Sequence, residues 1–272
     1  RGPFISRPKE DILEEAKLLA KKGIKELVVI AQDTTKYGLD LYNRPMLAEL
    51  LKMLCKVDGI EWIRFLYSYP EGISDESIQV VKEEDKICKY FDIPIQHISN
   101  SVLKRMNRKT NKENIQNVIS KIRENIPNAI RTTVMVGFPG ETKEDFNELY
   151  EFIRNVKFEN LGAFTYSKEE GTPASRLKEQ VHPMTKKSRY NKIMQLQQQI
   201  SKENLAKLQG KEIKVLIEDK TFDGKYYVGR SEIQVPDIDG MVYIKNDEEL
   251  KIGSFVNCKV IDSREYDLIA KV

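Results

Sequence analysis

The sequence predicts an α/β fold in which a partial parallel (β/α) barrel is followed by a small antiparallel β-barrel. Over residues 1–208, short apolar segments rich in β-branched residues alternate with segments whose apolar residues recur at helical spacing. Over residues 209–272, apolar residues instead occupy alternate positions between glycine-containing turns. The 272 residues, 40% of them hydrophobic, are enough to form a large core. We therefore expect two domains, 1–208 and 209–272.

Strand and helix patterns alternate five times along the first unit. Strands are expected at 26–31, 60–67, 90–95, 131–136 and 160–165, and helices at 8–22, 45–55, 74–82, 101–106, 112–125 and 142–153. The strands at 26–31 and 131–136 are expected to be buried, the latter on both faces. Five parallel strands imply a sheet that curves toward a barrel, with its loops gathered on one rim. Pro94 lacks an amide hydrogen, so we expect the strand ladder to be interrupted near it.

A long polar helix expected at 184–208, closed by Gly210, is interpreted as a spacer between the two units. After it come five strand patterns, at 212–218, 226–230, 242–244, 255–261 and 266–272. The turns between them contain Asp223-Gly224, Asp239-Gly240 and Gly253. Short strands separated in this way predict a five-stranded antiparallel barrel.

Charge differs between the two units. The whole chain has a formal net charge of +3, but residues 210–272 hold 10 basic and 13 acidic residues, a net of −3, which leaves +6 for the residues before them. An acidic tail does not favour binding to a phosphate backbone by charge alone. The sequence shows no membrane-span pattern or signal peptide and lacks an initiator methionine, so we expect a cytoplasmic location and an origin in a longer protein.

The cysteine content does not predict a disulfide framework or a metal site. Cys55, Cys88 and Cys258 are widely separated, whereas cysteines that bind a metal or cluster are usually two to four positions apart. We expect three reduced, buried thiols.

Polar or glycine-rich segments follow each predicted strand of the first unit, where parallel α/β folds bind ligands. The clearest is Gly-Phe-Pro-Gly-Glu at 137–141, which ends an apolar run and precedes a helix capped at Thr142. An ordinary loop, a helix-capping turn after residue 31 and a structural histidine at 97 are the alternative interpretations. The candidate site residues are Gln32, Asp33, Ser68, Gln96, His97, Ser99, Gly137, Gly140, Glu141, Phe164 and Tyr166.

Several motifs occur in the order found in a known family. They are Gln-Asp-Thr-Thr-Lys-Tyr-Gly at 32–38, Pro-Ile-Gln-His-Ile-Ser at 94–99, Gly-Phe-Pro-Gly-Glu-Thr at 137–142, Phe-Thr-Tyr-Ser-Lys-Glu-Glu-Gly-Thr-Pro-Ala at 164–174 and Gly-Arg-Ser-Glu-Ile-Gln-Val-Pro-Asp-Ile-Asp-Gly at 229–240. Together they resemble the methylthiotransferases, a branch of the radical S-adenosylmethionine (radical SAM) enzymes, over the whole chain. The first and last motifs resemble the members that modify an aspartate of a small-subunit ribosomal protein, and the tail resembles a TRAM domain, which is OB-like.

The resemblance implies a reaction and its cofactors. In this family a Cys-x3-Cys-x2-Cys loop binds a [4Fe-4S] cluster that holds S-adenosylmethionine, and a further N-terminal domain binds a second [4Fe-4S] cluster. The resemblance implies that a 5′-deoxyadenosyl radical takes hydrogen from the aspartate β-carbon, where a methylthio group is then added. None of the three cysteines matches a family ligand position, so we expect the ligands of both clusters to lie upstream of the position matching Arg1, and we expect this chain alone to hold no metal and to be inactive.

The resemblance also implies residue roles and partners. It places Gly137, Gly140 and Glu141 in the segment where the protein backbone approaches S-adenosylmethionine. Gln96, His97 and Ser99 are expected near its ribose or methionine portion, and Phe164 and Tyr166 behind its adenine. Gln32, Asp33 and Ser68 are expected on the same rim. The acidic tail fits a basic ribosomal protein as its partner, while RNA contact is also possible. The alternatives are a tRNA-adenosine methylthiotransferase and a non-catalytic module that binds RNA or protein.

Overall fold

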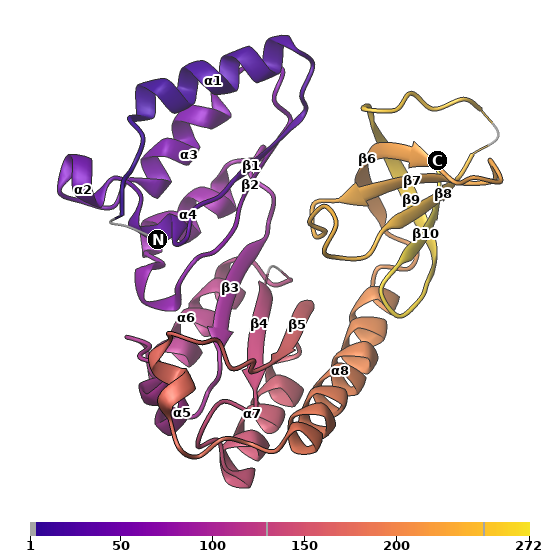
Figure 1. Cartoon of the computed structure of the whole chain (residues 1–272). Coiled ribbons are helices and arrows are strands. Elements are labelled where there is room, and N and C mark those ends of the chain that lie inside the picture. Colours follow the sequence, from indigo (N-terminus) through magenta and orange to yellow (C-terminus); the bar gives the residue numbers. More distant parts are fainter. Residues whose placement is uncertain (1–3, 129, 247) are drawn as a thin grey trace.

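The computed structural model describes residues 4–128, 130–246 and 248–272 (Figure 1). Arg1 and Gly2, which the resemblance aligns next to the cluster loop, lie outside these ranges. The first unit contains α1 (Lys9–Lys21), β1 (Glu26–Val29), η1 (Thr34–Lys36), α2 (Leu39–Tyr42), α3 (Leu47–Cys55), β2 (Trp62–Phe65), η2 (Pro70–Gly72), α4 (Asp75–Glu83), β3 (Phe91–Gln96), α5 (Asn100–Arg105), α6 (Lys112–Asn125), β4 (Ile130–Val136), α7 (Lys143–Val156), β5 (Asn160–Thr165), η3 (Pro173–Arg176) and α8 (Pro183–Ala206). The alternation of strands and helices is confirmed.

The parallel strands form two sheets rather than one continuous sheet. β1 pairs with β2, and β3, β4 and β5 pair in that order. Between β2 and β3 there remain an isolated bridge from Ile63 to Ile87 and a hydrogen bond of 2.9 Å from the Ser68 amide to the Asp92 carbonyl. The rings of Phe65 and Phe91 meet edge to face across this junction, with centroids 5.4 Å apart, so both sheets share one core.

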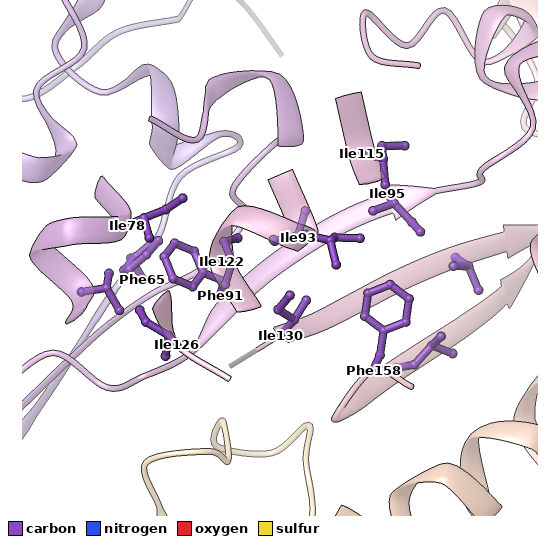
Figure 2. Packing of buried hydrophobic residues seen from close by; sticks show 14 of the residues in the cluster. Phe65, Ile78, Phe91, Ile93, Ile95, Ile115, Ile122, Ile126, Ile130 and Phe158 are labelled. Atoms are coloured by element: carbon purple, nitrogen blue, oxygen red, sulfur yellow. The ribbon is translucent and has the colours of Figure 1, made fainter. Parts of the chain in front are cut away.

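Figure 2 shows how this core is filled. Isoleucines of the helices, among them Ile78 of α4 and Ile115 and Ile122 of α6, point toward Phe91, Ile93 and Ile95 of β3. The amphipathic spacing that predicts these helices is also what places these side chains on the sheet. The buried face of the sheets is therefore the outer face of the partial barrel, covered by helices.

Two predictions about strand burial are wrong. β4 is not buried on both faces, because its residues alternate between buried and half-buried, and Arg131 and Thr133 face the inside of the open barrel. In β1, Val28 is 37% exposed, and Ile30 just beyond the strand is 66% exposed. β1 lies at the edge of its sheet and pairs only with β2 within the described residues, so one side of it is uncovered.

Pro94 has the predicted effect on β3. The register between β3 and β4 shifts between Ile93 and Gln96, where the missing proline amide removes one position from the hydrogen-bond ladder. Beyond the shift the ladder resumes, because Gln96 at the end of β3 pairs with Val134 of β4.

The long helix α8 is more than a spacer. It packs along β5 and α7 before it reaches the C-terminal unit (Figure 1). Gln197 is only 1% exposed, and its side-chain amide donates to the Phe158 carbonyl at 3.1 Å. Ile193 and Ile200 belong to the core of the first unit. The glutamines that make the sequence of α8 polar therefore lie partly at a helix-sheet contact.

The C-terminal unit is a closed barrel of five strands. These are β6 (Glu212–Lys220), β7 (Tyr227–Ser231), β8 (Val242–Lys245), β9 (Phe255–Ser263) and β10 (Leu268–Lys271), in the order β10-β8-β7-β6-β9. The predicted small barrel of about five strands is confirmed, and its pairs are antiparallel except that β8 and β10 are parallel. A closed ring with an odd number of strands cannot alternate direction throughout, so one parallel pair is unavoidable.

Within the described residues, we find no helix that combines the length and the apolar character required to span a bilayer.

A buried charge network holds the barrel against the amino ends of the parallel strands. Glu26 of β1 accepts from Arg64 Nε at 3.0 Å and from Arg230 of β7 at 2.5 Å. Glu218 of β6 accepts from the same Arg230. The side chain of Arg64 is fully buried and that of Arg230 is 2% exposed. Since a buried charge without a partner is very unfavourable, this network strongly restricts how the two units fit together.

We predict that Glu26→Ala lowers the free energy of unfolding by about 3–5 kcal/mol, because it leaves two buried guanidinium groups short of a partner. The matched control is Glu61→Ala, which removes an exposed ion pair with Lys214 across the same interface and should change stability by less than about 1 kcal/mol. Urea denaturation of both variants measures the difference, and equal losses would show that the network adds nothing beyond a surface pair.

Candidate active site

The carboxyl ends of four of the parallel strands line one cavity of about 700 Å³. Gln32 follows β1, Tyr67 follows β2, Gln96 ends β3 and Phe164 lies near the end of β5, whereas β4 lines the cavity through Arg131 and Thr133, near its start and middle. The expected gathering of strand ends at a common mouth is therefore seen for β1, β2, β3 and β5, but not for β4. A cavity of this size with aromatic walls and a few polar groups is typical of a small-molecule site.

Two residues that line the cavity have left-handed backbones although neither is glycine. Tyr67 has a φ of 60° and Gln96 a φ of 65°. The Tyr67 amide donates to Asp92 Oδ2 at 3.0 Å, and a tight turn from the His97 amide to the Ile95 carbonyl, at 2.8 Å, encloses Gln96. Such conformations are unfavourable and are found most often at functional sites, where neighbouring contacts enforce them. Both backbones are therefore held in fixed conformations at the wall.

The glycine-rich turn after β4 is organised by Glu141. This carboxylate is buried and accepts hydrogen bonds from the amides of Gly137 and, at 3.1 Å, of Phe138. Arg189 of α8 lies 3.2 Å from its other oxygen. Burial outweighs these stabilising contacts and raises the pKa of Glu141 to about 7. Glu141 thus shapes the turn from inside the protein and does not line the cavity.

His97 lies directly beside this turn. Its Nε2 is 4.0 Å from Glu141 Oε1, and its Nδ1 accepts from the Ser99 amide at 3.0 Å. Burial lowers the pKa of His97 to about 4, so the ring is neutral at pH 7. Ser99 Oγ donates to Asp145 at 2.5 Å, which joins the starts of α5 and α7. The structure brings His97, Ser99 and Glu141 together behind the cavity wall.

Both glycines of the turn have left-handed backbones, with φ of 73° at Gly137 and 82° at Gly140. A Cβ at Gly137 would collide with Lys186 of α8, and one at Gly140 would collide with Arg105. The Gly140 amide also donates to the Glu179 carbonyl at 2.7 Å. The close approach that these glycines allow is therefore to segments of this same chain, and contact with a cosubstrate stays a prediction.

Some of the remaining candidates line the cavity, and others stabilise the segments around it. Asp33 is buried and accepts from the Thr35 hydroxyl at 2.6 Å, so it caps η1 as the alternative interpretation expects. Ser68 is buried beside Thr34. Tyr166 packs edge to face on Phe138 with centroids 5.2 Å apart. Of the eleven candidates, the cavity is lined by Gln32, Gln96 and Phe164.

Tyr67, Arg131 and Ile238 are among the lining residues that were not candidates from the sequence. Tyr67 gives no signal without its backbone conformation, and Ile238 comes from the distant C-terminal unit. Arg131 could have been noticed as a charge at the start of an otherwise apolar strand. Its NH1 donates to Asp92 at 3.0 Å, and its Nε lies 3.5 Å from Asp239.

The described residues do not offer a ligand set for a metal cluster. Within residues 4–128, 130–246 and 248–272, no three histidine, cysteine or acidic side chains lie close enough together to hold a metal ion. Cys55, Cys88 and Cys258 are free thiols, but the expectation that all three are buried is wrong for Cys55, which is half-buried. Burial raises the pKa of Cys88 to about 12, which disfavours the thiolate.

Comparison with protein families finds two matches along the chain. Residues 1–153 match the radical SAM superfamily, and residues 210–272 match the TRAM domain. The ribosomal protein uS12 methylthiotransferase RimO of Alkaliphilus oremlandii is 60% identical over 274 residues, and that of Clostridioides difficile is 54% identical over 273. Both alignments cover 100% of this chain, and they cover 63% and 61% of the relatives, so the chain spans about three fifths of their length.

Solved structures share the fold. Coproporphyrinogen III oxidase (HemN) from Escherichia coli, a radical SAM enzyme, aligns with a TM-score of 0.53 and 17% identity, over 75% of this chain and 47% of that one. Methylornithine synthase (PylB) aligns with a TM-score of 0.51 and 13% identity, over 72% of this chain and 56% of that one.

The raised pKa of Glu141 predicts a specific dependence of stability on pH. The folded pKa of about 7 exceeds the reference value of 4.5, so the contribution of this group is fully present below pH 4.5 and is lost as pH rises through 7. Between these limits the unaltered protein should lose on the order of 3 kcal/mol of unfolding free energy through Glu141. Glu141→Gln should abolish this loss. His97 acts in the opposite direction, because its lowered pKa gives stability above pH 6.5 that is lost as pH falls through 4.

Denaturant unfolding of both proteins from pH 4.5 to 8 measures the effect. The variant retains His97, so the difference between the two curves isolates Glu141. Parallel curves would contradict the prediction.

Proposed function

This chain belongs to the radical S-adenosylmethionine superfamily, and from that membership we propose that it is the S-adenosylmethionine-binding and C-terminal part of an enzyme that methylthiolates the β-carbon of an aspartate in ribosomal protein uS12. The observation that carries this proposal is the alignment of the entire chain, at 60% and 54% identity, with two uS12 methylthiotransferases. The same partner suggests a cytoplasmic location.

We place S-adenosylmethionine in the cavity at the strand ends. Phe164 is 59% exposed and Tyr67 is 44% exposed, and both line the cavity, so either ring is available to stack on adenine or to face the sulfonium charge. Gln32 and Gln96 offer side-chain amides for the ribose and methionine portions. When bound at an iron–sulfur cluster, S-adenosylmethionine supplies the radical and the methyl group.

The other candidates act in this proposal by holding the walls. Glu141 fixes the turn after β4, His97 and Ser99 fix the start of α5, and Asp33 fixes η1. Ser68, Gly137, Gly140 and Tyr166 complete the packing around these segments. A rigid wall keeps a reactive cosubstrate in one orientation and keeps water and other quenching groups away from it.

We further propose that the ribosomal protein meets the acidic tail. The net charge of −3 on residues 210–272 is complementary to a basic protein and speeds encounter with it.

One feature favours RNA as a second candidate. Tyr226 and Tyr243 pack edge to face with centroids 6.3 Å apart on the barrel surface, and Lys245 lies 5.7 Å from the Tyr226 ring, which resembles a small stacking platform for bases.

Mass spectrometry of ribosomal proteins tests the substrate. In a strain that lacks the full-length gene, we expect uS12 to lose a methylthio group and a plasmid copy of the gene to restore it. Loss of a methylthio group from tRNA, with uS12 unchanged, would favour the tRNA-adenosine enzyme instead.

The cosubstrate site is tested with Phe164→Ala in the full-length protein. Removal of a stacking ring should weaken S-adenosylmethionine binding by about tenfold, as measured by equilibrium dialysis. The matched control is Phe222→Ala, since Phe222 is fully exposed in the β6–β7 turn and does not line the cavity. Equal affinities for the two variants would exclude Phe164 from the site.

A further inference from the structure

The C-terminal barrel contributes directly to the wall of the cavity. Val235 and Ile238, in the segment 232–241 between β7 and β8, line the same space as Asp92, Arg131 and the strand ends. We call this segment the barrel loop. It follows the buried Arg230 that pairs with Glu26, so the network that docks the barrel also places this loop.

The barrel loop is held rigidly by Asp239. The carboxylate of Asp239 accepts from the Val235 amide at 2.9 Å and from the Tyr90 hydroxyl at 2.6 Å, and lies 3.5 Å from Arg131 Nε. Gly240 fits because a Cβ there would collide with the Tyr266 carbonyl. Asp239 thus connects the loop to itself, to the residue before β3 and to β4.

Although its loop is fixed, the side chain of Ile238 is 52% exposed. It joins Tyr67 and Phe164, the two other large, exposed hydrophobic side chains of the cavity. Asp237, immediately before it, has a left-handed backbone with a φ of 61°, a third such residue near this space. A fixed loop that presents an exposed isoleucine to a cavity is preorganised for an apolar contact.

The barrel loop lies at the part of the cavity near the amino ends of β3 and β4, away from the carboxyl ends of the strands. Asp92 and Arg131, which lie beside it, are each the second residue of their strands, whereas Gln96 and Phe164 lie at the opposite ends. The cosubstrate proposed above occupies those carboxyl ends. The two sheets do not join into a closed ring (Figure 1), and both units line this inner part of the cavity, with Asp92 and Arg131 from the strands and Val235 and Ile238 from the barrel loop.

We propose that Ile238 is a specificity-determining residue that contacts the apolar side of the polypeptide segment carrying the reacting aspartate. Asp239 is a positioning residue, because it holds Arg131 and fixes the backbone that presents Ile238. This inference rests on the proposed function, since it assigns the protein substrate of that reaction to the inner part of the same cavity.

The test compares Ile238→Ala with Ile261→Ala. Ile261 is 47% exposed on β9 and does not line the cavity, so it is a matched isoleucine of the same barrel. The full-length protein, reconstituted with its clusters, is assayed for its affinity for purified uS12, for the KM of uS12, and for S-adenosylmethionine affinity without uS12. We expect Ile238→Ala to weaken uS12 binding and raise its KM roughly five- to tenfold. S-adenosylmethionine affinity should not change.

Each other outcome is decisive. Equal uS12 affinity in the two variants overturns the role of Ile238 while leaving the proposed function intact. A parallel loss of S-adenosylmethionine affinity would show that Ile238 shapes the cosubstrate site and also overturns the inference. If the unaltered protein neither binds nor modifies uS12, the proposed function itself fails. Because Ile238 is half exposed, both variants should fold, and equal melting temperatures confirm this.

Discussion

The bridge that Glu26 makes between two buried guanidinium groups determines how the molecule is put together. One of these groups comes from β2 and the other from the C-terminal barrel, so Glu26 couples the two units, while Arg230 also pairs with Glu218 of its own barrel. Arg64 also lies 4.9 Å from the Tyr90 ring, whose hydroxyl binds Asp239. Contacts therefore run without interruption from the docking network to the wall of the cavity. A structure that buries charge in this way tolerates few alternative arrangements of its units.

The cavity concentrates unfavourable backbone conformations that the rest of the fold compensates. Tyr67, Gln96 and Asp237 come from three separate segments, yet each is left-handed at or beside the same space. Their neighbours enforce these conformations through Asp92, the turn at His97 and Asp239. Residues in regular strands would point alternately into and out of the sheet, whereas these turns orient side chains that the strand pattern would place elsewhere.

Local patterns predicted most of the fold. The helix at 112–125 and the strand at 160–165 have the expected bounds, because apolar spacing and capping residues are properties of the segment itself. The interruption at Pro94 follows from one missing amide. Features that depend on distant partners were not predictable, such as the uncovered side of β1 and the burial of Gln197. In the site, sequence placed His97 and Glu141 correctly near each other but could not show that both lie behind the wall. The sequence also could not show that Ile238 and Arg131, which are more than a hundred positions apart, line the same cavity.

The cavity wall comes from two units, and these two parts of the wall differ in how freely they can change in evolution. The strands that line the cavity are bound into one core, where a change at any position disturbs many neighbours. The barrel loop is a short connection between two strands of a separate barrel, and only a few of its side chains reach the cavity. Substitutions confined to this loop can therefore change the lining of the cavity during evolution, while the core that positions the strands stays intact.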